Sequence, residues 1–168
     1  VTIQDINIRS SGDAIDVGSS SANITLEGDN KIFSKTGSAL HVSDGHVTIT
    51  GSGSLEAEIG DNDGNGNNND NAKIGSHEGE DMSGKIHITG SATVTTKSDE
   101  EGDFDGSYGY NGNGAGIGSG EDGNMSGAII IDENANVTAF SKSDGAGIGS
   151  GYDGVMSGDI TIGGSAQV

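Results

Sequence analysis

Apolar and polar residues alternate in short runs along most of this chain. One apolar–any–apolar triplet recurs five times: Ile24-Thr25-Leu26, Val47-Thr48-Ile49, Ile86-His87-Ile88, Ile129-Ile130-Ile131 and Ile160-Thr161-Ile162. A period of two is typical of a β-strand with one buried face, and no run is long enough for an amphipathic helix. The pattern therefore predicts a protein that is nearly all β.

Two further strands recur along with the triplet. The apolar anchors of the second strand stand eight residues after the first apolar position of each triplet: Ile32, Leu55, Val94, Val137 and Val168. The third strand aligns in five copies and has two apolar columns: Ile15, Leu40, Ala72, Ala115, Ala146 and Val17, Val42, Ile74, Ile117, Ile148. This alignment stacks Ile24 on Val47, Ile32 on Leu55 and Val42 on Ile74.

The spacing of the triplets predicts the architecture. From Ile24 to Val47 is 23 residues, which suits three short strands and three corners, and the later intervals lengthen to 39, 43 and 31 residues. Stacked turns place equivalent residues about 4.8 Å apart, so the apolar columns become continuous inside a solenoid. We expect one right-handed parallel β-helix domain of about five turns over residues 1–168, the hand following the general rule for parallel crossovers. Open solenoid ends expose pairing edges, so we expect this domain to be part of a longer protein.

The extra residues of the later turns fall at two corners. They precede the third strand at 58–71, 98–113 and 141–145, and they follow it at 75–84, 118–127 and 149–158. Loops at one corner of a solenoid stack into a single surface, which is where we expect function. Met82, Met125 and Met156 stand at one place in the second set of loops, and we expect them to fill a gap at the corner.

Composition narrows the possible partners. The chain has no cysteine to form disulfides, and its formal net charge of −19 disfavours nucleic acid, whose phosphates require clustered Lys and Arg. No apolar run is long enough for membrane insertion. Cations and neutral or basic partners remain.

Acidic residues in the longest loops predict a calcium site. DNDGNGNNND (61–70) matches the start of an EF-hand-type loop but has Ala72 where the bidentate Glu would stand, and DEEGDFDGS (99–107) adds more carboxylates. Carboxylates this close repel one another unless a cation lies among them, although a solvated acidic face is the alternative. The candidate Ca²⁺ ligands are Asp61, Asp63, Asn65, Asp70, Asp99, Glu100, Glu101, Asp103 and Asp105. A second acidic column, of Glu78, Glu80, Asp81, Glu121, Asp122 and Asp153, is as consistent with capping of corner amides as with metal.

The three tyrosines all stand in loops. An exposed ring can stack on a sugar face while neighbouring amides and carboxylates bond its hydroxyls, although simple packing over a loop is the alternative. The candidate ligand-binding residues are Tyr108, Tyr110, Asn111, Asn113, Tyr152 and Asp153.

Part of the chain resembles known repeats. GAGIGSGEDGNMSGAIIIDENANVTA and GAGIGSGYDGVMSGDITIGGSAQV, within 114–168, resemble glycine-rich repeats of large surface and secreted proteins of anaerobic Gram-positive bacteria. The architecture and acidic loops are more distantly similar to bacterial extracellular β-helix proteins that hold calcium and bind plant cell-wall polymers. The resemblance implies an extracellular or cell-surface location and a polysaccharide or glycan as partner.

Catalysis is the least favoured of three functions. The four histidines, at 41, 46, 77 and 87, have no paired spacing that indicates zinc, and we interpret them as isolated surface residues. The only arginine, Arg9, lies in the first turn, and no pair of carboxylates stands out as a hydrolytic pair. We expect a non-catalytic, calcium-stabilised carbohydrate-binding module, with a structural spacer or adhesin stalk second and a polysaccharide-degrading enzyme third.

Overall fold

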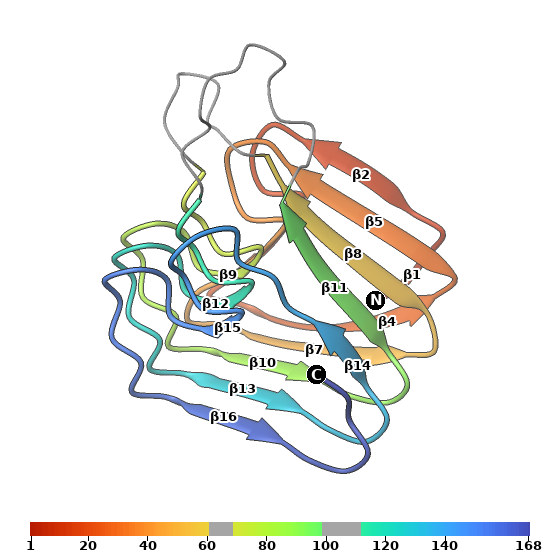
Figure 1. The fold of residues 1–168 in the computed structure, drawn as a ribbon. Coiled ribbons are helices and arrows are strands. Elements are labelled where there is room, and N and C mark those ends of the chain that lie inside the picture. Colours follow the sequence, from red (N-terminus) through yellow and green to blue (C-terminus); the bar gives the residue numbers. More distant parts are fainter. Residues whose placement is uncertain (61–68, 99–111) are drawn as a thin grey trace.

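The computed structural model describes residues 1–60, 69–98 and 112–168, and within them every regular element is a β-strand. Consecutive strands belong in turn to three parallel sheets, A, B and C (Figure 1). Sheet A has the order β1-β4-β7-β10-β13-β16, sheet B β14-β11-β8-β5-β2, and sheet C β15-β12-β9-β6-β3. Each strand pairs with the one three places later in the chain, which is the topology of a parallel β-helix. The expected fold is confirmed.

The strand bounds are as follows. Sheet A consists of β1 (Thr2–Gln4), β4 (Ser21–Glu27), β7 (His46–Gly51), β10 (Lys85–Ile88), β13 (Ala128–Ile131) and β16 (Asp159–Ile162). Sheet B consists of β2 (Asn7–Ser10), β5 (Asp29–Ser34), β8 (Ser54–Ile59), β11 (Thr93–Ser98) and β14 (Asn136–Thr138). Sheet C consists of β3 (Ile15–Gly18), β6 (Leu40–Val42), β9 (Ile74–Gly75), β12 (Ile117–Gly118) and β15 (Ile148–Gly149).

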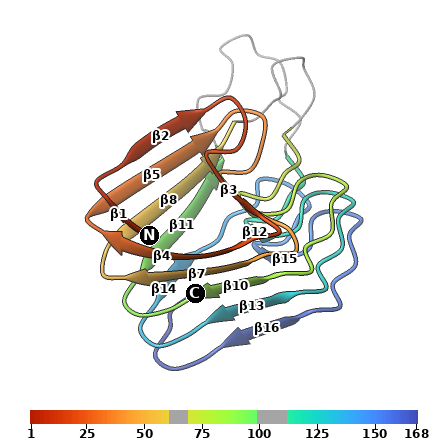
Figure 2. The same ribbon diagram turned by 180° about the vertical axis from the view of Figure 1, so that it is seen from behind.

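The core is a set of aliphatic columns contributed by all three sheets, which face one another around it (Figure 2). In sheet A one column runs through Ile24, Ile49, Ile88, Ile131 and Ile162. Alternate residues of each strand point inward, so the burial of β13 follows the predicted period of two. Met82 and Met125 are fully buried and bridge to one another, and Met156, on the last loop of the same column, is 42% exposed. The gap-filling role expected of the methionines therefore holds for the two that have a further loop stacked on them.

A bulge in β3 pairs Gly18 with Val42 where Val17 was expected. Three other expected registers in the early turns are wrong, each by two residues. Ile24 pairs with Ile49 instead of Val47, Ile32 pairs with Ala57 instead of Leu55, and Leu40 instead of Val42 pairs with Ile74. A shift of two keeps every side chain on its own face, so the apolar pattern cannot detect it.

A buried asparagine accounts for the register of sheet B. Asn30 occupies the place opposite Leu55 and is 1% exposed. Its amide group donates to the carbonyls of Glu27 and Ser54, both at 3.0 Å, and its Oδ1 accepts from the Ile6 amide at 3.3 Å. One polar side chain thus links the corners of three successive turns, which satisfies backbone groups that burial would otherwise leave unpaired.

Glycine shapes sheet C. Gly75, Gly118 and Gly149 stack on one another with φ between 139° and 141°. A Cβ atom at Gly75 would collide with the carbonyl oxygen of Gly118, and one at Gly118 with that of Gly149. Both the backbone angle and the close approach of the next turn therefore require glycine. After these glycines the chain leaves the sheet and forms the loops at 76–84, 119–127 and 150–158.

No described segment contains a helix with the length and apolarity that a membrane crossing requires.

The three consecutive isoleucines of β13 offer a direct test of the core. Ile131 is fully buried, whereas its neighbour Ile130 is partly exposed on the outer face. We expect Ile131→Ala to lower the free energy of unfolding by about 2–5 kcal/mol, because it leaves a cavity in the column. The matched control Ile130→Ala should cost less than about 1.5 kcal/mol. Denaturant unfolding checks both, and equal losses would contradict the inward assignment.

Candidate functional site

The loops that follow sheet C stack on one another as expected. Two fully buried serines, Ser76 and Ser119, each donate a hydroxyl hydrogen to a carbonyl of their own loop, of Glu80 and Gly123 respectively, at 2.6 Å. The same hydroxyls accept from the amides of Gly120 and Gly151 in the next loop, at 3.4 and 3.1 Å. Each serine therefore closes its own loop and joins it to the next, which holds the surface side chains in fixed columns.

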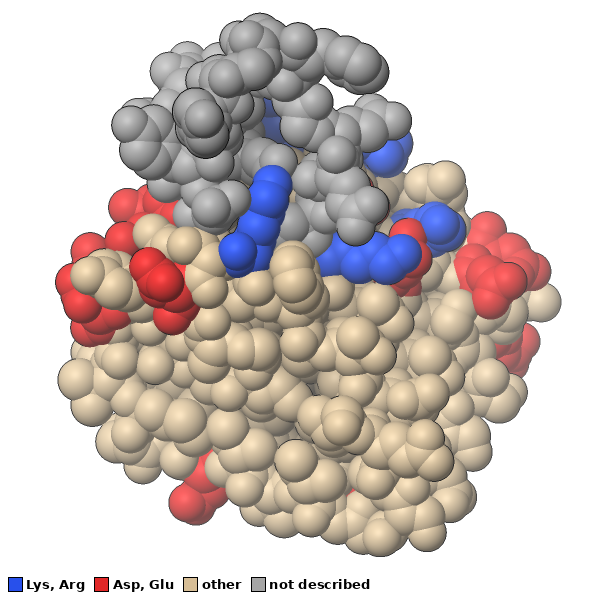
Figure 3. Space-filling model, in the orientation of Figure 1, with Lys and Arg blue, Asp and Glu red and all other residues tan. Residues whose placement is uncertain are grey.

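Equivalent positions in these columns follow from the paired glycines and methionines. Seven residues separate Gly75 from Met82, Gly118 from Met125 and Gly149 from Met156. One column therefore contains Glu78, Glu121 and Tyr152, and a second contains Asp81, Asn124 and Val155. In the space-filling view, acidic side chains gather at the left margin of the molecule (Figure 3), where Figure 1 places these loops.

The second column caps corner amides. The Asp81 carboxylate accepts from the backbone amide and the side-chain amide of Asn124, at 2.8 and 3.0 Å. Asn124 Oδ1 in turn accepts from the amide of Val155 at 3.0 Å. Of the two roles that the sequence left open for this acidic column, Asp81 therefore has the capping role.

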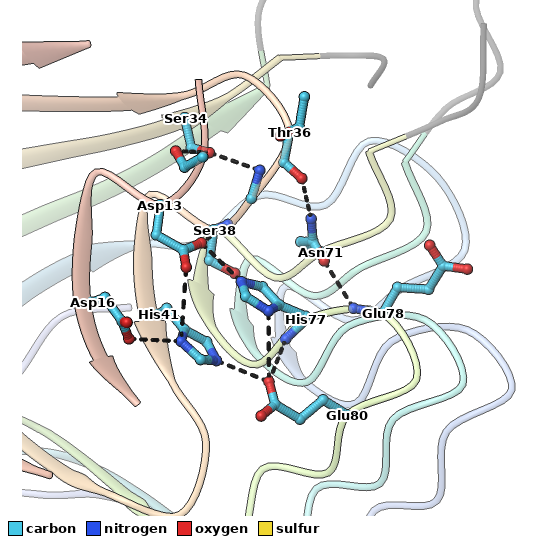
Figure 4. A network of polar contacts seen from close by, with 12 residues as sticks. Asp13, Asp16, Ser34, Thr36, Ser38, His41, Asn71, His77, Glu78 and Glu80 are labelled. Carbon is cyan, nitrogen blue, oxygen red and sulfur yellow. Dashed lines mark hydrogen bonds and ion pairs between the residues drawn. The ribbon is translucent and has the colours of Figure 1, made fainter. Parts of the chain in front are cut away.

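The first column belongs to a cluster that we call the acidic corner: Asp70, Glu78, Glu121 and Asp122. Asp70 lies in the loop before β9, is 9% exposed and accepts from the Asn113 amide at 2.8 Å. The side-chain amide of Asn113 donates to Glu121 Oε2 at 3.2 Å. Asn71 orients Glu78 by accepting from its backbone amide at 2.8 Å (Figure 4).

The acidic corner carries excess negative charge. Burial raises the pKa of Glu78 above its ordinary value, and the charges of Asp70 and Asp122 raise it further. Burial also raises the pKa of Glu121, and Asp70 and Asp122 add to this rise, although the hydrogen bond from Asn113 opposes it. Carboxylates with raised pKa values are held in an environment that disfavours their charge, which is the condition that a bound cation relieves.

Tyr152 lies beside this corner. The residue is 43% exposed. Its backbone amide donates to the Asn113 carbonyl at 3.0 Å, and its backbone carbonyl accepts from the Asp122 amide at 2.9 Å. The exposed Asp153 follows it with a left-handed φ of 56°, the conformation that Asp122 adopts one turn earlier at 57°. Of the sequence-predicted residues, the structure therefore brings Asp70, Asn113 and Tyr152 to one corner, with Asp153 next to Tyr152.

The other candidate residues lie outside the described part of the chain. They are the calcium candidates Asp61, Asp63, Asn65, Asp99, Glu100, Glu101, Asp103 and Asp105, and the ligand candidates Tyr108, Tyr110 and Asn111.

A second cluster was missed by the sequence analysis. His41 and His77 stack face to face, with ring centroids 4.0 Å apart and planes inclined by 5°. His41 is 8% exposed, so the interpretation of both histidines as isolated surface residues is wrong. They are 36 positions apart and meet only because β6 and the loop after β9 belong to adjacent turns.

Three carboxylates surround the two rings (Figure 4). Asp16 Oδ1 lies 2.8 Å from His41 Nδ1, and Asp13 Oδ1 lies 2.8 Å from His77 Nε2. On the opposite edge, Glu80 Oε2 lies 2.8 Å from His41 Nε2. Burial lowers the pKa of His41, but the hydrogen bonds to Glu80 and Asp16 and the charges of Glu80 and Asp13 outweigh burial, so the net shift is upward.

Comparisons with known proteins give no assignment: no family model, no curated protein and no solved structure matches this chain. The resemblance to surface-protein repeats stays a prediction.

The acidic corner yields a test of its charge balance. Because the pKa of Glu121 is raised on folding, the folded protein binds more protons than the unfolded chain in the window above the ordinary glutamate pKa, so stability falls as pH rises through that window. We expect Glu121→Gln to raise stability at neutral pH by at most about 1 kcal/mol, or about 2–4 °C in melting temperature. The gain should shrink as the pH falls toward the ordinary glutamate value. Thermal melting in a chelator at several pH values checks this.

The matched control is Glu27→Gln, which neutralises an exposed acid at the end of β4. It should change the melting temperature less than Glu121→Gln does. A loss of stability in Glu121→Gln at neutral pH would show that its charge is not opposed by its neighbours.

Proposed function

We propose that this protein is a non-catalytic, extracellular β-helix module that binds carbohydrate and is stabilised by calcium. The observation that carries the proposal is the column of Glu78, Glu121 and Tyr152, which places an exposed aromatic ring beside clustered oxygen ligands. Sugar-binding sites commonly pair a ring that stacks on an apolar sugar face with amides and carboxylates that bond its hydroxyls.

The side chains of the acidic corner are of the kind that binds calcium. Ca²⁺ takes six to eight oxygen ligands from carboxylates, amide carbonyls and water. Asp70, Glu78 and Glu121 supply carboxylates, and the charge of Asp70 acts on both glutamates. Asn113 donates hydrogen bonds to Asp70 and to Glu121. A bound Ca²⁺ would offset the burial and the repulsion from Asp70 and Asp122 that together raise the pKa values of the two glutamates. It would also join the loop before β9 to the loop after β12.

A structural spacer is the second candidate function. It is favoured by the aliphatic columns, which are continuous from the first strands of each sheet to the last and need no ligand to hold the turns together. Degradation of a polysaccharide is the third candidate, and it predicts turnover instead of binding alone.

The calcium part of the proposal is tested by thermal melting with Ca²⁺ or with a chelator. Free Ca²⁺ at 100 times its dissociation constant should stabilise the protein by about 2.7 kcal/mol. Asp70→Asn should weaken this response, because it keeps an acceptor for the Asn113 amide but removes the charge. The control Asp159→Asn, on the exposed start of β16, should leave it unchanged. A melting temperature that does not depend on Ca²⁺ would contradict calcium stabilisation and favour the spacer.

The carbohydrate part is tested with an array of neutral and acidic plant polysaccharides in the presence of Ca²⁺. Binding should be measurable for the unmodified protein and about tenfold weaker for Tyr152→Ala, which is the effect of losing about 1.4 kcal/mol. Phe140→Ala removes an exposed ring at another corner and serves as the control. Absence of binding to every polymer would contradict this function, and release of shortened products would favour the enzyme.

A further inference from the structure

The His41–His77 cluster is the place where the repeat departs from its own pattern. By the glycine and methionine pairing, His77 is equivalent to Gly120 and Gly151, and Glu80 is equivalent to Gly123 and Gly154. A Cβ at Gly120 would meet the backbone of His77 and Glu78, and one at Gly123 the carbonyl of Glu80. A side chain at these positions would point toward the preceding turn. In the two later loops the backbone of that turn already occupies this space.

The first long loop has room because the turn before it has no such loop. Between β6 and β7 the chain needs only three residues, 43–45. The side chains of His77 and Glu80 therefore extend toward the preceding turns and meet His41 and Asp13 (Figure 4). His41 and His77 thus meet where two neighbouring turns differ in length.

The two edges of the stacked rings are chemically different. One edge presents His41 Nδ1 and His77 Nε2 together with Asp13 and Asp16. The other edge presents His41 Nε2, 2.8 Å from Glu80 Oε2, and His77 Nδ1, 3.8 Å from the same oxygen. Glu80 Oε2 also accepts from the His77 backbone amide at 3.2 Å, so this carboxylate is held against the rings.

Two histidines beside several carboxylates are a set of side chains that could hold a metal ion. A histidine that binds a metal through one nitrogen commonly donates the other ring N–H to a carboxylate, which sets its tautomer and orientation. We propose that Asp13, His41 and His77 bind one divalent transition-metal ion on the first edge, with Asp16 completing the coordination and Glu80 orienting the ring of His41. Two imidazoles and two carboxylates are ligands that suit Zn²⁺ in a tetrahedral site.

The candidate ligand atoms would have to move slightly closer together to bind Zn²⁺. One ligand atom from each of Asp13, His41 and His77 lies within 4.8 Å of the other two. Tetrahedral Zn²⁺, with bonds of about 2.0–2.1 Å, separates its ligand atoms by about 3.4 Å. The parallel rings also have to tilt so that both lone pairs converge on the ion. The exposed side has the freedom to do so, since the His77 side chain is 36% exposed and the Asp16 side chain 65%.

The ion would join three successive turns. Asp13 precedes β3, His41 is in β6, and His77 follows β9. Three carboxylates around two imidazoles leave an excess of negative charge at the cluster when the rings are neutral, and a divalent cation reduces it. The site is independent of the proposed carbohydrate function and of its calcium ligands.

The test is isothermal titration of the chelator-treated protein with Zn²⁺ at slightly alkaline pH, above the ordinary imidazole pKa. A large excess of Ca²⁺ is present to occupy sites made of oxygen alone. We expect one equivalent of Zn²⁺ to bind, with His77→Gln and Asp13→Asn each weakening the affinity at least tenfold. His87→Gln is the matched control, because His87 lies on β10 and contacts a single carboxylate, that of Asp132 at 3.0 Å. It should bind Zn²⁺ as the unmodified protein does.

A second readout reports the ligands. Co²⁺ in place of Zn²⁺ should give the intense visible absorption of a tetrahedral site, and His77→Gln should abolish it while circular dichroism shows an intact fold. Absence of one-equivalent binding, equal binding by His77→Gln, or equal weakening by His87→Gln would each overturn the proposal. In those cases the stacked histidines serve only as polar packing between turns.

Discussion

The hydrogen-bond ladder between successive turns is the constraint on which the rest of this structure depends. Each strand from β1 to β13 pairs in parallel with the strand three places later, so equivalent residues of neighbouring turns lie about 4.8 Å apart. At that separation identical aliphatic side chains pack into continuous columns, and identical loops pack backbone to backbone. The ladder thus explains both the isoleucine columns inside and the glycines at corners such as Gly118, where a neighbouring carbonyl occupies the space of a Cβ atom.

The same stacking creates an electrostatic problem on the surface. A residue repeated in every turn becomes a column, and a column of like charges repels itself. The loops after sheet C reduce their charge from turn to turn: Glu78 and Glu121 are followed by Tyr152, and Asp81 is followed by Asn124 and Val155. Where two acids remain in one column, as for Glu78 and Glu121, burial and the charges of Asp70 and Asp122 raise the pKa of each. The Asp81 column avoids repulsion in another way, because the Asp81 carboxylate accepts hydrogen bonds from the amide groups of Asn124 in the next loop.

Irregularity in the ladder produces the cluster with the richest chemistry. A regular solenoid would place glycine at positions 77 and 80, as the two later loops do. The first long loop stands beside a turn with a three-residue corner, and this difference in length lets His77 and Glu80 reach His41, Asp13 and Asp16. Departures from the repeat are therefore as informative about function in this protein as the repeat itself.

Sequence and tertiary structure contributed different things. The period of two and the recurrence of the isoleucine triplets determined the fold, because burial of one strand face leaves a direct trace in residue order. The positions of the loops after sheet C could also be predicted from the sequence, since Met82, Met125 and Met156 stand near their C-terminal ends. The register of the early turns could not, because a two-residue shift preserves the pattern. In sheet B the hydrogen bonds of the buried Asn30 distinguish the alternatives. Asp70 and Asn113 could be named from composition, yet their contact required the stacking of their loops. The meeting of Asp13, His41 and His77 was decided by tertiary structure alone: their separation in the chain carries no periodic signal, and only the different lengths of neighbouring turns bring their side chains together.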